Sequence, residues 1–208
     1  MSRTLGLRNR QRVRAIDTRL LRRIARWALE AQFHAADYEL GLHLVAAAEM
    51  ARVNESFLGH HGSTDVITFD HREAVGPQSR LALRRASPCP TAHEAERRTP
   101  MRLDAKNFRT SRIGVRRSVS VQGRQPAKNS GIHGEIFLCV NDAVAQARLL
   151  GTTWQSELAR YLLHGLLHLH GFDDLTPAAR RTLKRQENRL LRLAQRRFPL
   201  RRLARTRS

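Results

Sequence analysis

The sequence has few cysteines, few aromatic residues and no long hydrophobic run. Cys89 and Cys139 are its only cysteines, too few for a disulfide framework, so we expect two reduced thiols. Aromatic residues make up 5% of the chain, which predicts a modest core. No apolar run approaches the roughly 20 residues that cross a bilayer, and the N-terminus lacks the apolar segment of a secretory signal. We therefore expect a cytoplasmic protein without membrane contact.

Acidic residues are also scarce, with 18 Asp and Glu against 38 Lys and Arg. The excess lies in residues 71–130, with 14 basic residues against 4 acidic, and in residues 180–208, with 12 against 1. Positive charge of this density attracts polyanions by releasing their counterions, and nucleic acid is the polyanion that we expect. The alternative is that the arginine content merely reflects a GC-rich genome.

Hydrophobic periodicity divides the chain into interspersed strands and helices. Strands are predicted over residues 11–17, 38–45, 65–69 and 134–140. Helices are predicted after Asp17, over residues 46–57, 142–150 and 154–170, and from Pro177 to about residue 195. Asp17, Asn141 and Thr176 are predicted N-caps, and Gly59, Gly151 and Gly171 are predicted helix ends. The pattern indicates an α+β or α/β class with about four strands.

Residues 71–130 interrupt this pattern. They hold most of the prolines and show no sustained period of either kind. A structureless stretch this long inside a domain is usually disordered or functional. We predict one domain formed by residues 1–70 and 131–195, a basic, mostly disordered insertion at residues 71–130, and a basic C-terminal tail at residues 196–208.

Two histidines four residues apart mark the candidate site. His164 and His168 lie in a predicted helix, where this spacing puts both imidazoles on one face. Gly171 allows the chain to turn back, so that Asp173 or Asp174 can return a carboxylate to the same ion. Three protein ligands and one open position are typical of a catalytic zinc site, in which bound water becomes a usable nucleophile.

An isolated histidine pair is weak evidence, because such pairs are often ordinary surface residues. Here the helix is otherwise strongly apolar, so its polar residues need partners. A zinc peptidase of the H-E-x-x-H type would need glutamate in place of Gly165, so peptide hydrolysis loses support. Glu157 is expected to be a helix-surface residue or an ion-pair partner. His170 lies well round the helix from the pair and is expected to be a non-ligand.

The run HGLLHLHGFDD, residues 164–174, resembles the metal motif of the YbeY endoribonuclease family, which are bacterial rRNA-maturation and ribosome quality-control nucleases. That motif reads H-G-x-L-H-L-x-G-[YF]-D-H. Three further segments are similar to family segments in the same order: VNESF at 53–57, STDVITF at 63–69 and GEIFLC at 134–139. The resemblance covers residues 1–70 and about 131–195.

The resemblance implies a mixed four-stranded sheet with helices packed around it and a metal site on a core helix and the turn after it. It implies one Zn²⁺ per chain, held by His164, His168 and Asp174, beside a basic RNA-binding cleft. Asp174 stands where the family usually has histidine. A carboxylate oxygen is an acceptable zinc ligand, so we expect the site to persist, with a preference shifted toward harder ions.

A second departure from the family concerns RNA binding. Leu58 stands where the family usually places an arginine that can contact a phosphate. His60 and His61 are candidate replacements for that charge, as are arginines of the insertion, and the alternative is that both histidines are ordinary loop residues.

The expected function is a single-strand-specific, metal-dependent endoribonuclease acting in rRNA maturation, including the 3′ end of 16S rRNA, and in ribosome quality control. Its expected partners are RNA and the ribosome or small-subunit proteins, with no small-molecule cofactor. Asp173 is expected to orient the ligands rather than to act as a base. One alternative is a non-catalytic, ribosome-associated RNA-binding protein with a structural metal. Another is a different metallohydrolase, such as a peptidase.

Overall fold

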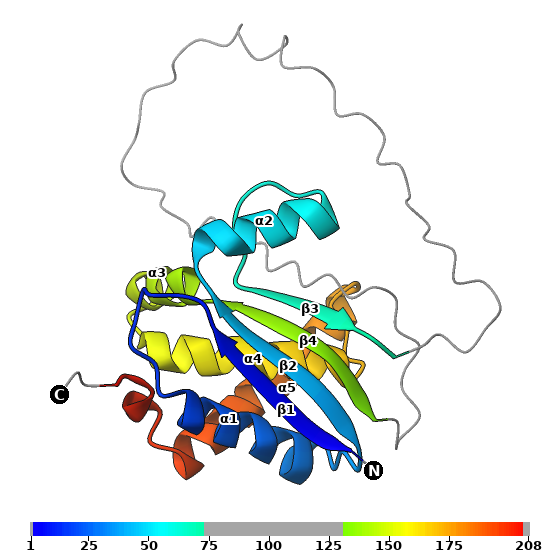
Figure 1. Ribbon diagram of the computed structural model, residues 1–208. Helices are drawn as coiled ribbons and strands as arrows, with labels where there is room; N and C mark the ends of the chain where they lie inside the picture. Colours follow the sequence, from blue (N-terminus) through cyan, green and yellow to red (C-terminus); the bar gives the residue numbers. More distant parts are fainter. Residues whose placement is uncertain (1, 73–130, 206–208) are drawn as a thin grey trace, which may run out of the picture. The chain divides into compact units, whose positions relative to one another are not determined.

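One four-stranded sheet organises the computed structural model, which describes residues 2–72 and 131–205 (Figure 1). Its strands lie in the order β1-β2-β4-β3. Strands β1, β2 and β4 are parallel, and β3 is antiparallel to β4. The bounds are β1 Arg3–Asn9, β2 Tyr38–Val45, β3 Val66–Asp70 and β4 Ile132–Cys139. The mixed sheet confirms the predicted α+β class. Residues 73–130 of the predicted insertion lie outside the described residues.

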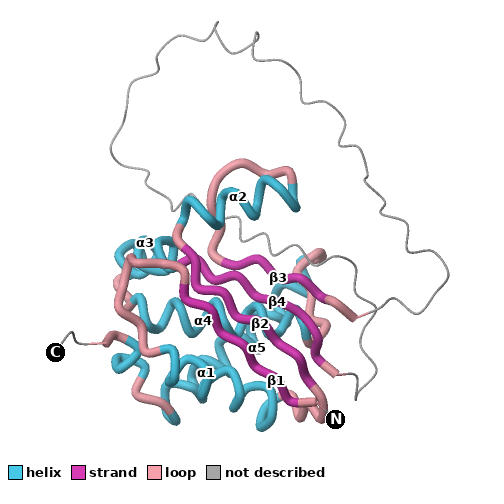
Figure 2. The backbone as a smooth tube through the Cα atoms, viewed as in Figure 1, coloured by secondary structure: helices cyan, strands magenta, loops and turns pink. Residues whose placement is uncertain are grey.

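The described helices pack around this sheet (Figure 2). None of them is long and apolar enough to cross a membrane. Their bounds are α1 Thr18–Trp27, which continues into the π-helical η1 Ala28–Gln32, then α2 Ala47–Leu58, α3 Val140–Leu150, α4 Trp154–Leu169, α5 Pro177–Arg197 and the 3₁₀ helix η2 Leu200–Leu203.

Side-chain caps fix where α1 and α5 begin. The Asp17 carboxylate accepts a hydrogen bond from the Leu20 amide at 3.0 Å, and the Thr176 hydroxyl accepts one from the Ala179 amide at 3.1 Å. Both predicted caps are confirmed, and each satisfies an amide that the helix leaves without an internal partner. Gly151, which the sequence places at the end of α3, has a φ of +63°, a conformation that glycine adopts without steric cost.

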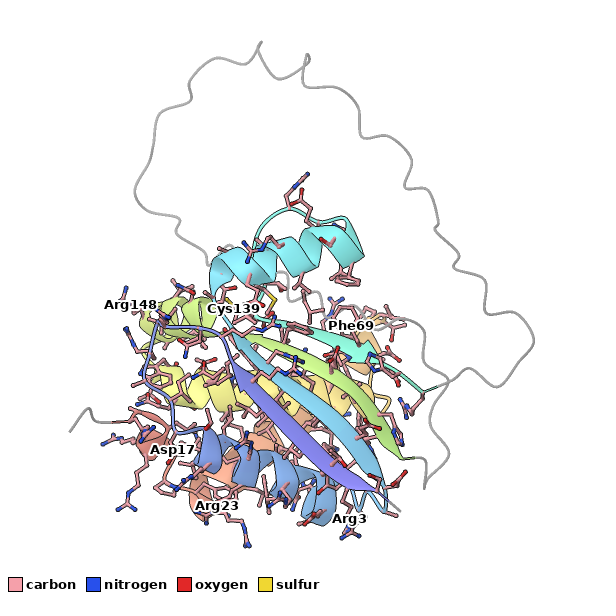
Figure 3. The ribbon with its side chains drawn as sticks, in the orientation of Figure 1. Arg3, Asp17, Arg23, Phe69, Cys139 and Arg148 are labelled. Atoms are coloured by element: carbon pink, nitrogen blue, oxygen red, sulfur yellow. The ribbon has the colours of Figure 1, made fainter. Side chains whose placement is uncertain are left out.

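The two faces of the sheet are covered unequally. One face packs against α1 and α4 and forms the main core, and α5 packs in turn against α4. The other face carries α2, over a small cluster of Val45, Met50, Ile67 and Cys139. Figure 3 shows Cys139 near α2 at the end of the sheet. Helix α4 is therefore enclosed on two sides, by the sheet and by α5.

The first strand is Arg3–Asn9, so the prediction of a strand over residues 11–17 is wrong. Residues after Asn9 form a turn instead, because the Gln11 side chain both donates to the Arg14 carbonyl and accepts from the Arg14 amide, at 2.9 and 3.0 Å. Strand β1 is an edge strand in which only Leu5 and Leu7 are apolar at alternating positions, and this weak alternation explains why the sequence did not reveal it.

The predicted role of Asn141 as the cap of its own helix is also wrong. Helix α3 begins two residues earlier than predicted, at Val140, and Cys139 is its N-cap residue. The Asn141 side chain accepts a hydrogen bond from the Ala47 amide at 2.9 Å. It therefore provides the acceptor for an amide in the first turn of α2, across the end of the sheet.

The segment that was predicted as a basic tail from residue 196 packs onto the domain as far as Arg205. Phe198, Leu200 and Leu203 are buried there. The Asp17 amide donates to the Leu203 carbonyl, and the Arg205 amide donates to the Ala15 carbonyl. Three apolar side chains thus anchor this segment to the domain, although its arginines suggested a free tail.

Candidate active site

Helix α4 carries the candidate site inside the protein. His164 and His168 are 3% and 5% exposed, as buried as the leucines around them. Thr153 caps the start of the helix by accepting a hydrogen bond from the Ser156 amide. After the last turn, Gly171 adopts a φ of +93°, which confirms the predicted break. The histidines therefore lie at the C-terminal end of a helix whose position is fixed on two sides.

The two imidazoles converge as their spacing predicts. Their Nε2 atoms lie 3.1 Å apart, and their rings meet edge to face with centroids 4.7 Å apart. Two buried imidazole nitrogens at this distance are favourable only with a proton or a cation between them. The pair is thus arranged to share one positively charged ligand.

Glu187 of α5 holds His164 from behind. Its Oε2 lies 2.9 Å from His164 Nδ1, and its Oε1 accepts hydrogen bonds from Arg160 and Lys184, each at 2.8 Å. The carboxylate requires a proton on Nδ1, which leaves Nε2 to face His168. Burial alone would raise the pKa of Glu187, but the hydrogen bonds and charges of His164 and Lys184 hold it well below its usual value. Glu187 was not among the predicted site residues.

A second buried carboxylate extends the network. Glu157 is fully buried, accepts a hydrogen bond from the Thr152 hydroxyl at 2.9 Å and pairs with Arg160 at 3.3 Å. The prediction of an ion-pair partner is confirmed for Glu157, whereas a surface position is wrong. Arg160 joins Glu157 to Glu187 and so links the start of α4 to the site.

His168 is suited to donate a lone pair. Burial above all, and then the charge of His164, lower the pKa of His168 to about 3, so the imidazole is neutral near pH 7. The ring also hydrogen-bonds the backbone of Phe172 in the turn after α4. Such a bond fixes the tautomer and orientation of a metal-binding histidine.

The turn after α4 places the two aspartates differently. The Asp173 carboxylate accepts a hydrogen bond from the Leu175 amide at 3.1 Å and so stabilises its own loop, whereas Glu187 orients His164. Asp174 is half-buried; burial raises the pKa of its carboxyl, while the charges of His164 and Arg180 act the other way. Asp174 therefore lies within electrostatic reach of His164.

The donor set fits a metal in two of its three positions. Two nitrogen ligands of a tetrahedral zinc ion with bonds of about 2.05 Å lie roughly 3.3 Å apart, close to the 3.1 Å between the two Nε2 atoms. Within residues 2–72 and 131–205, however, no three His, Cys, Asp or Glu side chains are grouped so as to hold an ion. The structure brings His164 and His168 together and does not gather Asp174 with them.

Gly165 explains why a peptidase motif does not fit this helix. A Cβ atom on Gly165 would lie 2.8 Å from Cγ2 of Ile136 in β4 and 3.4 Å from the Thr68 hydroxyl. The helix thus touches the sheet at the position where a zinc peptidase carries its glutamate. A longer side chain there would push α4 off the sheet.

The other candidate residues lie elsewhere. Among the described residues, His61 pairs with Glu55 of α2 at 3.1 Å, and neither His60 nor His61 forms a hydrogen bond or ion pair with the histidines of α4. Leu58 packs against the small cluster under α2. His170, predicted as a non-ligand, stacks on Phe33 with ring centroids 4.6 Å apart.

Comparisons with known proteins agree with this fold. The solution structure of a protein from Thermotoga maritima matches 95% of this chain and 95% of its own, with a TM-score of 0.52 at 17% identity. This likeness shows that the two proteins share the same α+β fold. A family profile described as "Endoribonuclease YbeY" matches residues 6–195. The chain therefore belongs to that family.

Individual relatives carry the same family name. "Endoribonuclease YbeY" of Salinibacter ruber is 25% identical over 178 residues, which are 86% of this chain and 83% of the relative. Its namesake from Gloeobacter violaceus is 30% identical over 165 residues, which are 79% of this chain and 61% of the relative. The expected family membership is thus confirmed.

Proposed function

We propose that this protein is a single-strand-specific, metal-dependent endoribonuclease of the cytoplasm. It acts on rRNA, including the 3′ end of 16S rRNA, in maturation and quality control, and it meets the ribosome or small-subunit proteins. The observation that carries the proposal is the buried imidazole pair, with its Nε2 atoms 3.1 Å apart and His164 held by Glu187.

His164 and His168 would hold one zinc ion, and Asp174 would complete the set by turning its half-buried carboxylate toward the pair. When bound, such an ion acts as a Lewis acid on phosphodiester oxygens and supplies a nucleophile at neutral pH. Glu187 keeps the proton on Nδ1 of His164, so that the opposite nitrogen faces the ion. Burial keeps His168 neutral, as a ligand must be.

The experiment compares cleavage of a single-stranded rRNA fragment by the wild type and by His168→Ala. His170→Ala is the matched control, because His170 belongs to the same helix end but stacks on Phe33. We expect the His168 variant to lose cleavage and bound zinc together, the latter by elemental analysis, and the control to keep both. Equal cleavage by the wild type and the His168 variant would reject the site. A duplex of the same sequence should resist cleavage.

A structural role for the metal is the competing reading. Chelation distinguishes the two, because a structural ion stabilises the fold whereas a catalytic ion can leave an intact fold behind. We expect chelated protein to keep its circular dichroism spectrum and cooperative unfolding while losing cleavage. Unfolding on chelation would favour the structural role.

A further inference from the structure

The outer face of α5 carries five arginines in one line. Arg181, Arg185, Arg189, Arg192 and Arg196 follow one another at steps of four, four, three and four residues, and all five are exposed. At 100° per residue these steps keep them within one side of the helix. The buried residues of α5 occupy the opposite side. We call the five residues the arginine stripe.

The stripe has no internal counter-charge. Glu187 is the only acidic residue of α5, and it is buried on the inner face. Within the described ranges, none of the five arginines forms an ion pair with a carboxylate, and only Arg185 donates a side-chain hydrogen bond, to the Thr182 hydroxyl. Like charges one turn apart repel one another on a helix surface. A polyanion lying along the stripe would remove that repulsion.

The stripe starts next to a residue that contacts the turn carrying Asp174. Near its start, Lys184 contacts the same Glu187 carboxylate that holds His164, and Arg180 donates to the Asp174 carbonyl. From residue 181 to residue 196 the helix rises about 22 Å. The first stripe residue thus follows directly on a contact with the turn that carries Asp174, and the stripe runs from there along the outer face of α5.

Further arginines continue the positive surface at the far end. The guanidinium groups of Arg197 on α5 and Arg23 on α1 both lie over the ring of Phe198, 5.9 and 6.0 Å from its centroid. Because Phe198 is buried, it fixes both groups relative to α5. Figure 3 shows Arg23 on the outer side of α1.

We propose that the arginine stripe binds the phosphate backbone of the RNA outside the cleavage site and so favours long single strands over short ones. The inference rests on the proposed function for the identity of the polyanion. Among the residues that the structure describes, no stripe arginine lies over an aromatic ring, and evenly spaced guanidinium groups of this kind suit phosphates rather than bases. Contacts of this kind position a strand without reading its sequence.

The test removes the stripe charge and measures RNA binding with and without the metal chemistry. The variant carries R185Q, R189Q, R192Q and R196Q, and leaves Arg180 and Arg181 beside the site. The matched control carries R8Q, R12Q, R52Q and R148Q, which remove equal charge from exposed arginines of other elements. The probes are an oligoribonucleotide of about six residues, near the small end of single-strand site sizes, and a transcript several times longer.

We expect the stripe variant to bind the long transcript at least tenfold more weakly, measured in EDTA so that cleavage plays no part. Its plot of log affinity against log salt should become shallower by about 0.7 per arginine engaged. The short oligonucleotide should bind as before. In metal-loaded protein, KM for the long transcript should rise while kcat stays unchanged.

Three results would overturn the proposal: unchanged affinity for the long transcript, an equal loss in the matched control, or a stripe that binds polyglutamate but not RNA. Equal weakening with single-stranded DNA would support a backbone contact. A wild type that binds long RNA through the stripe but cleaves nothing would support the stripe and reject the proposed function, so the two failures are distinguishable.

Discussion

The inner and outer faces of α5 carry charges of opposite sign in opposite surroundings. On the inner face, the buried Glu187 carboxylate pairs with His164, Arg160 and Lys184. On the outer face, the five residues of the arginine stripe are exposed and, among the described residues, pair with no carboxylate. The inner charge orients His164, whereas the outer charges are accessible to a binding partner.

This difference predicts different consequences for the two faces. A buried charge is stable only while its partners remain, so a substitution on the inner face should affect the fold and the metal site together. An exposed charge in water contributes little to stability. Changes on the outer face should therefore alter RNA binding and leave the fold unchanged.

Glu187→Ala should have the largest effect. The substitution removes one acceptor from the largely buried Arg160 and frees His164 from its orientation. We expect a loss of about 3–5 kcal/mol in the free energy of unfolding and about 10- to 100-fold in zinc affinity. Urea unfolding of the metal-free protein and competition with a zinc chelator measure the two quantities.

Glu55→Ala provides the control for that experiment, because Glu55 is an exposed carboxylate that also pairs with a histidine. It should change stability by less than about 0.5 kcal/mol. A Glu187 variant as stable as the Glu55 variant would show that the inner face does not depend on its charge network.

Phe198→Ala tests the apolar anchor beneath the basic surface. The ring is 6% exposed and packs edge to face on Trp27, with centroids 5.6 Å apart. We expect a loss of about 3 kcal/mol, typical of a buried phenylalanine. Arg202→Ala, on the exposed side of the same segment, should be nearly neutral. Equal stability of the two variants would mean that this segment behaves as the free tail that its arginines suggest.

Much of the site was predictable because its information is local. The spacing of His164 and His168, the glycine after them and the caps of the helices are short-range patterns, and short-range geometry follows from them directly. Glu187 was missed because it lies 23 residues from His164, and only packing brings α5 against α4. One signal was available: it is the sole acid of a basic helix and lies on the face of Leu183 and Leu190.

The position of the third ligand could not be derived from the sequence in the same way. Asp174 follows Gly171 in a turn, where the carboxylate direction depends on the backbone conformation of several residues in succession. The strand β1 and the packed segment after α5 were missed for another reason. Their apolar residues are few among arginines, and composition alone favours tail or loop.

Cys139 gives a contrast with Glu187 that appears only at alkaline pH. Both groups are buried, but Asp142 rather than a cation stands near the thiol, and burial raises the pKa of Cys139 to about 12. The native thiol keeps its proton at pH values where the unfolded thiol, with a pKa near 9.0, loses it. Stability should therefore fall as pH rises from about 9 toward 12, by up to about 1.4 kcal/mol per pH unit.

Cys139→Ala should remove this part of the decline. The comparison is made in a Cys89→Ser background, so that the reference protein has only the Cys139 thiol and the variant has no thiol. Urea unfolding of both is measured across the alkaline range. Parallel pH profiles for the two proteins would show that the buried thiol does not take part in alkaline destabilisation.

Arg189→Glu should have the smallest effect and the opposite sign. The new carboxylate lies one turn after Arg185 and one turn before Arg192. Two repulsive pairs on the arginine stripe thereby become attractive pairs. Each such pair contributes about 0.2–0.5 kcal/mol on a helix surface, so stability should rise by about 0.5–1 kcal/mol while affinity for long RNA falls. A variant that loses both stability and RNA affinity would indicate that Arg189 has a structural partner, and the contrast between the two faces of α5 would not hold.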